Sequence, residues 1–156
     1  MKAASISELK KELKFKSKEE LLDYCMAMAR FKLESKELLT YLAFESEDEA
    51  AYIESVKNYI SAEFETINTV SYHYIKKSIR KILRQVKRYI RYSKKPATEA
   101  EVLIYFCKTL SEMKPSYKRN KVLVNSYDTQ LRMANKAIAK LHEDLQYDFQ
   151  LLIDEL

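Results

Sequence analysis

The chain has 156 residues, of which 47% are hydrophobic and 33% charged, with a formal net charge of +5 and no glycine. This length favours one domain with a sizeable core, and the lack of glycine argues against β-hairpins, whose tight turns draw heavily on that residue. The composition therefore predicts an all-α protein with a single domain over 1–156. We expect six or seven mostly antiparallel helices in a bundle or an irregular α–α superhelix, with no sheet.

Three helices are predicted in the first third of the chain. Helices over 5–14 and 17–33 each begin with the capping-box spacing, in which a serine precedes a glutamate by three positions. The second of these helices is apolar over a wide face, so we expect it to be central in the core. A third helix is predicted over 36–44, with Ser35 as its N-cap.

An acidic helix followed by a basic one is predicted in the middle of the chain. The acidic helix covers 45–67, begins with a capping box at Ser46, and contains seven acidic residues and a single lysine over 45–65. The basic helix covers 69–93. Asn68 and the threonine after it would separate the two helices, although one continuous helix with a kink is an equally open alternative.

The basic stretch 74–95 is the most unusual feature of the sequence. Ten of the 28 Lys and Arg residues lie within it, and no Asp or Glu occurs over 66–98. On a helical wheel the ten cations fall within an arc of about 140°, opposite an apolar stripe that faces the core. The candidate anion-binding or nucleic-acid-binding residues on this arc are Lys76, Lys77, Arg80, Lys81, Arg84, Lys87, Arg88 and Arg91.

The last third of the sequence is predicted to form one apolar helix followed by a long helical region. A capping box at Thr98 starts the apolar helix over 99–113. The remainder forms either one long helix over 118–155 or two helices, with the break expected in the polar stretch 125–129. Apolar residues at alternating steps of three and four form a seam over 124–145, which is typical of a coiled coil and would permit a homodimer.

Motifs for catalysis and cofactor binding are missing from the sequence. Phosphate-binding loops, dinucleotide fingerprints, nucleophile elbows and EF-hand loops all need glycine, so none is present in its usual form. His73 has no acidic neighbour in sequence, and His142 lacks a second histidine at the spacing of a zinc protease. The sequence therefore predicts no enzyme, no cofactor and no metal site.

The cellular location is predicted from what the sequence lacks. No apolar run approaches the roughly 20 residues that cross a bilayer, so no transmembrane segment is predicted. The N-terminal residues do not resemble a secretory signal. Cys25 and Cys107 lie in apolar helical contexts, which favours buried thiols over a disulfide. A cytoplasmic protein is therefore expected.

Three interpretations of the basic arc remain open from sequence alone. It is a solvated face whose edges pair with the acidic helix through Glu54, Glu63 and Glu65; or it binds nucleic-acid backbone without sequence specificity; or it binds an acidic protein or an anionic membrane surface. We predict a non-enzymatic helical binding protein, with nonspecific nucleic-acid binding as the alternative function.

Overall fold

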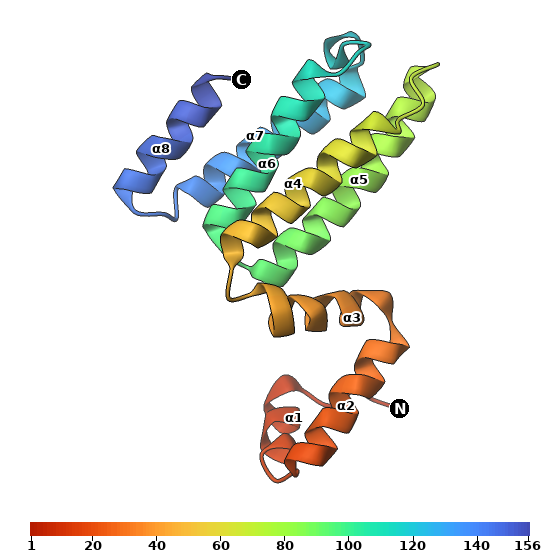
Figure 1. Ribbon diagram of the computed structural model, residues 1–156, viewed down its shortest axis with the longest axis vertical. Coiled ribbons are helices and arrows are strands. Elements are labelled where there is room, and N and C mark those ends of the chain that lie inside the picture. Colours follow the sequence, from red (N-terminus) through yellow and green to blue (C-terminus); the bar gives the residue numbers. More distant parts are fainter. The chain divides into compact units, whose positions relative to one another are not determined.

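The computed structural model describes residues 1–156 and is all-helical, with eight α-helices and no strand (Figure 1). The predicted all-α class is confirmed, but the predicted count of six or seven helices is too low. The chain divides into two compact units, residues 1–44 and residues 45–156. Whether the two units behave as a single domain, as the sequence predicts, stays a prediction.

The N-terminal unit, residues 1–44, begins with three α-helices and ends in a π-helical turn that runs on to Glu45. The capping boxes predicted at Ser5 and Ser17 are both present: each serine accepts a hydrogen bond from the backbone N–H of the glutamate three residues later, and each glutamate accepts one from the serine N–H. The bounds are α1 Ile6–Leu13, α2 Lys18–Phe31, α3 Leu33–Thr40 and η1 Tyr41–Glu45.

Two predictions for this unit are wrong. The helix α2 is not a central core helix, because Ala29 is its only buried residue and Leu22 and Met28 are 61% and 58% exposed. Ser35 does not cap α3. The helix begins at Leu33, two residues before Ser35, and its N-cap is Lys32, whose side chain makes no capping hydrogen bond. A wide apolar face identifies a surface that favours burial, but it does not say that the rest of the same chain buries it.

The second unit, residues 45–156, contains the remaining five α-helices and a 3₁₀ turn. Figure 1 shows α4 to α7 lying side by side, with successive helices running in opposite directions, and α8 beside α6 and α7. The bounds are α4 Glu49–Glu65, α5 Tyr72–Ser93, α6 Pro96–Glu112, η2 Tyr117–Arg119, α7 Lys121–Ile138 and α8 Glu143–Asp154.

The core of this unit is organised around α6. Eight residues of α6 are buried, including Leu103, Phe106 and Leu110, and the helix packs against α4, α5, α7 and α8. The apolar stripe predicted on the basic helix is confirmed, because its residues at three- and four-residue steps are almost fully buried: Ile75, Ile79, Ile82 and Val86. Burial of this stripe leaves the opposite face of α5 available to solvent.

The acidic and basic regions form two helices rather than one. Thr66 caps the C-terminus of α4, and its hydroxyl donates to the carbonyl of Glu63 at 2.9 Å. The side chain of Asn68 then accepts a hydrogen bond from the backbone N–H of Val70 at 3.0 Å, which closes a local turn. Asn favours this conformation because its side chain competes with the helical hydrogen bonds of the backbone.

The long C-terminal helix over 118–155 is not formed, and the break lies at 139–142 instead of the predicted 125–129. His142 is the N-cap of α8, and its Nδ1 accepts a hydrogen bond from the backbone N–H of Asp144 at 3.3 Å. The polar residues of 125–129 sit inside α7, where polar side chains are accommodated on the outer face. The coiled-coil seam over 124–145 is therefore interrupted within its last heptad.

Two further predicted capping boxes are absent. Asp48, not Ser46, is the N-cap of α4, and its carboxylate accepts a hydrogen bond from the N–H of Ala51 at 3.0 Å. Pro96 begins α6, two residues before the predicted cap at Thr98. Proline is common at the first helical position, because the amide N–H it lacks has no partner there. No helix of the chain combines the length and apolar character that a membrane crossing requires.

Candidate anion-binding surface

The eight predicted cations all lie on α5, on the side opposite its buried stripe. We call this set the basic face. Lys76, Lys87 and Arg88 are half-buried, because their stems lie at the flanks of the helix. The exposed members are Lys77, Arg80, Lys81, Arg84 and Arg91.

Tertiary packing holds α5 in place despite its unfavourable charge distribution. The first turn of α5 has no acidic residue to complement the helix dipole, and its N-cap Ser71 makes no side-chain hydrogen bond. The helix is instead fixed by its buried stripe and by Tyr52 of α4, whose hydroxyl donates to the backbone carbonyl of Tyr89 at 2.9 Å. The basic face is therefore presented by a rigid core element.

The acidic helix neutralises little of the basic face. Of the three acids expected to pair with it, only Glu63 does so, with its carboxylate 3.6 Å from the ammonium of Lys81. Lys81 is 74% exposed, so this pair contributes only about 0–1 kcal/mol. Glu54 pairs instead with Lys57 of its own helix at 2.7 Å, and Glu65 has no ion-pair partner.

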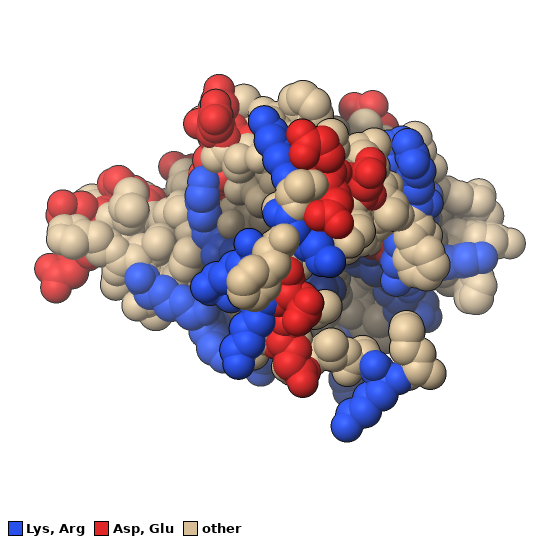
Figure 2. Space-filling view, turned by 90° about the horizontal axis from the view of Figure 1, so that it is seen from below, with Lys and Arg blue, Asp and Glu red and all other residues tan.

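Four cations at the centre of the arc have no acidic partner within 4 Å: Lys77, Arg80, Arg84 and Arg91. At a rise of 1.5 Å per residue they span about 21 Å along the helix. On the face of the molecule drawn in Figure 2, Lys and Arg side chains are intermixed with Asp and Glu, so that face carries no single sign of charge. On α5 these four cations form one row of positive charge without acidic partners.

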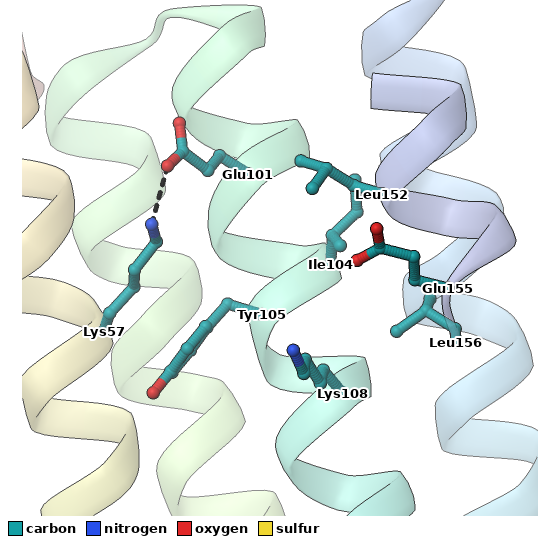
Figure 3. Close-up of a pocket in the computed structure, with 8 residues that line it drawn as sticks. All are labelled: Lys57, Glu101, Ile104, Tyr105, Lys108, Leu152, Glu155 and Leu156. Carbon is teal, nitrogen blue, oxygen red and sulfur yellow. Dashed lines mark hydrogen bonds and ion pairs between the residues drawn. The ribbon is translucent and has the colours of Figure 1, made fainter. Parts of the chain in front are cut away.

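A small pocket of about 140 Å³ lies among α4, α6 and α8 (Figure 3). Its wall includes Lys57, whose ammonium lies 2.7 Å from Glu101 and 5.8 Å from the centre of the Tyr105 ring. Burial alone would lower the pKa of Lys57, but the hydrogen bonds to Glu101 and Glu54 outweigh it and raise the pKa overall. This lysine is thus held in its charged form, which suits a structural ion pair and not a general base.

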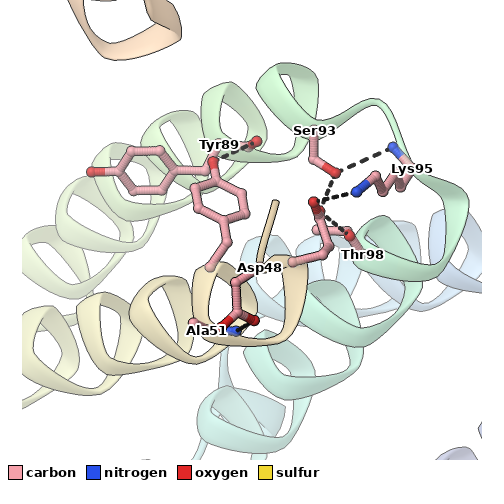
Figure 4. Close-up of polar contacts among 8 residues, drawn as sticks. Asp48, Ala51, Tyr89, Ser93, Lys95 and Thr98 are labelled. Atoms are coloured by element: carbon pink, nitrogen blue, oxygen red, sulfur yellow. Dashed lines mark hydrogen bonds and ion pairs between the residues drawn. The ribbon is translucent and has the colours of Figure 1, made fainter. Parts of the chain in front are cut away.

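A second polar cluster joins the start of α4 to the α5–α6 junction (Figure 4). The carboxylate of Glu49 accepts hydrogen bonds from the hydroxyls of Ser93 and Thr98, the latter at 2.6 Å, and from the ammonium of Lys95 at 2.8 Å. Ser93 and Thr98 are buried. The Glu49 cluster is therefore a structural clamp. It escapes prediction from the sequence because both Glu49 and Thr98 also fit the spacing of capping boxes.

The groups that most often perform catalysis are not brought together. His142 caps a helix, and the exposed His73 packs its ring edge-on against Tyr74, with ring centres 5.5 Å apart. Burial, and secondarily the charge of Asp128, raises the pKa of the Cys107 thiol to about 12, which keeps it protonated and weakly nucleophilic. No three His, Cys, Asp or Glu side chains are grouped so that they could hold a metal ion.

Comparison with known proteins adds no relative. No family model, curated protein or solved structure matches this chain. Function is therefore inferred from the geometry and charge of the chain's own surfaces.

Proposed function

We propose that this protein is a non-enzymatic binding protein whose basic face docks onto an acidic surface of a partner protein. One observation carries the proposal: the four central cations of the basic face are exposed and lack acidic partners, on a helix whose other side is anchored in the core. Like charges held on one rigid rod repel one another, and an oppositely charged surface relieves that repulsion.

The distribution of charge favours a compact acidic partner over a long polyanion. Outside the ten basic residues of 76–95, the chain holds 18 Lys and Arg against 23 Asp and Glu. An extended nucleic acid that ran beyond α5 would meet residues whose summed charge is slightly negative, so it would gain little further attraction there. A protein with a localised acidic patch would contact α5 alone.

A membrane surface fits less well, because the apolar side of α5 is not free to insert. Ile75, Ile79 and Val86 are at most 2% exposed, so insertion of the helix would require the second unit to open. The basic face can make only peripheral electrostatic contacts with lipid headgroups.

Binding of nucleic-acid backbone is the second candidate function. It is favoured by the regular placement of the cations, with at least one on each turn from Lys77 to Arg91, and by Tyr74, whose side chain is 48% exposed at the start of the row. An exposed aromatic ring beside cations can stack on an unpaired base. Such binding would be nonspecific and strongly weakened by salt.

A charge-removal variant tests both functions. In the variant Lys77→Gln/Arg80→Gln/Arg84→Gln/Arg91→Gln we expect loss of retention on a heparin column at low ionic strength. The matched control removes four exposed cations from α7 and the residues just after it: Lys121→Gln, Arg132→Gln, Lys136→Gln and Lys140→Gln. We expect this control variant to be retained on the column. Both variants should unfold at the wild-type denaturant concentration, since exposed unpaired charges contribute little stability.

Anisotropy titrations then separate the two functions. Tighter binding to labelled poly-glutamate than to single- or double-stranded DNA of equal charge supports an acidic protein partner. Tighter binding to either DNA, with a salt slope that falls by up to about 0.9 for each cation removed, supports the second function. A wild-type chain that passes through heparin unretained contradicts both.

A further inference from the structure

Exposed large apolar side chains are concentrated in two places. Of the 20 such residues in the chain, 13 lie within 1–44 and four lie on α8. The other three are scattered singly, which is normal for a protein surface. Contiguous exposed apolar surface of this kind usually marks an interaction site.

The first concentration contains an open groove of about 880 Å³ between α2 and the α3–η1 segment. Its lining includes Leu22 and Met26 of α2, one turn apart on one helix face, and Phe31 at the end of α2, which is 89% exposed. No acidic residue lines the groove. Three exposed cations do: Arg30, Lys32 and Lys36. The groove therefore suits an apolar helix face with acidic flanks.

The helix α8 has this composition. Its inner side packs into the core of the second unit through Phe149 and Ile153. Its outer side presents Tyr147 and Leu151, which are 66% and 48% exposed and one turn apart. Flanking them on the same side are two exposed carboxylates four residues apart, Asp144 and Asp148.

We propose that the groove lined by residues 22–44 binds α8 of a second copy of this chain. Tyr147 and Leu151 of one copy lie on the apolar floor of the groove in the other. The carboxylates beside them face the groove's three cations. The contact is head-to-tail, because two different surfaces of the chain meet in it.

Three features favour a second copy as the occupant. The charges are complementary throughout: no acid lines the groove, and residues 141–156 contain five acids and no Lys or Arg. The lengths also match, because α8 has 12 residues and α2, which forms one wall, has 14. Finally, the outer side of α8 is exposed although its inner side is packed, so the helix can dock without leaving its own core.

This inference is independent of the proposed function. The groove and the outer side of α8 share no residue with the basic face, so self-association can fail while the binding of acidic ligands by α5 persists. It also differs from the homodimer predicted through the seam over 124–145, whose Ala134 and Ile138 are buried against α6 within one chain.

Paired charge reversals in the full-length chain test the contact. The groove variant is Lys32→Glu/Lys36→Glu, and the α8 variant is Asp144→Lys/Asp148→Lys; all four positions are exposed. In sedimentation velocity at low salt we expect the wild type to self-associate and each variant to be monomeric. An equimolar mixture of the two variants should associate again, because an acidic groove then meets a basic helix.

An apolar truncation tests the floor of the groove without changing charge. Leu151→Ala should weaken self-association by at least about tenfold in dissociation constant, whereas Val122→Ala, at a residue 40% exposed on α7, should change it less than about twofold. Circular dichroism and urea unfolding that match the wild type show that each variant is folded.

Several outcomes would overturn the proposal. The first is a wild type that stays monomeric up to about 1 mM, even if the groove takes up acidic helices from other proteins. The others are folded charge-reversal variants that associate as well as the wild type, or a mixture of them that remains monomeric. Association that survives both reversals would assign the oligomer to another surface.

Discussion

Lys94 ends α5 in the left-handed conformation, with φ at 59°. It is the only residue of the chain with a positive φ, and in a chain without glycine this position must be filled by a residue with a side chain. Its backbone N–H still donates to the carbonyl of Ile90 at 3.0 Å, as the end of a helix requires. The conformation is unfavourable for lysine because the Cβ atom crowds the carbonyl oxygen.

We expect Lys94→Gly to raise the free energy of unfolding by roughly 0.5–1 kcal/mol. Glycine has no Cβ atom, so relief of the crowding should exceed the extra entropy of the unfolded chain. Urea unfolding followed by circular dichroism measures the change. The same substitution at Lys136, on the exposed side of α7, should instead lower stability by about 1 kcal/mol. Equal destabilisation at both positions would contradict this account of Lys94.

At the scale of helices, the Glu49 clamp determines how α4 meets the α5–α6 junction. One carboxylate in the first turn of α4 receives two hydroxyl groups and one ammonium, all from residues 44 to 49 positions later in the chain. The Glu49 side chain is only 19% exposed, so water cannot readily replace it. Loss of the acceptor would leave buried hydroxyls without partners.

We expect Glu49→Ala to lower the free energy of unfolding by roughly 2–4 kcal/mol, the usual penalty for stranding buried polar groups. Glu49→Gln, which keeps an acceptor oxygen, should cost less. Glu54→Ala is the matched control: Glu54 is 64% exposed, and Lys57 keeps its pair with Glu101, so the change should stay under about 1 kcal/mol. Coinciding denaturant unfolding curves for Glu49→Ala and Glu54→Ala would show that the Glu49 clamp contributes no more stability than an exposed ion pair.

At the scale of the whole molecule, buried apolar residues are distributed very unevenly. Only Ala29 and Tyr41 are buried hydrophobic residues among residues 1–44, and the other 22 belong to the second unit. Since burial of apolar surface is the main favourable contribution to folding, the second unit carries nearly all of the stability. The first unit keeps its helices through capping and local packing.

Hydrogen exchange followed by mass spectrometry should show this difference directly. Under native conditions and at low protein concentration, backbone amides of α2 should exchange at least about 100-fold faster than those of α6, because fewer buried contacts oppose their opening. Protection of α2 that rises with protein concentration would agree with occupation of the groove by a second copy. Equal protection of α2 and α6 in the dilute monomer would contradict the proposed uneven stability.

Local rules were reliable where the interacting residues are close in sequence. The capping boxes at Ser5 and Ser17 and the buried stripe of α5 followed from spacing alone, because both features involve neighbours within one or two turns. The same spacing misled at Ser46 and Thr98. In the case of Thr98, a residue distant in sequence, Glu49, competes for the side chain and overrides the local motif.

The sequence by itself determined the all-α class, the position of α5 and the charge on its outer face, because composition and periodicity depend only on the order of residues. Only the tertiary structure decided which apolar faces are buried. The faces of α5 and α6 have partners, whereas the wide apolar face of α2 remains open to solvent. The physical reason is that the hydrophobic effect has no direction: a pattern shows that a face favours burial, but the fold of the whole chain decides whether that face is buried.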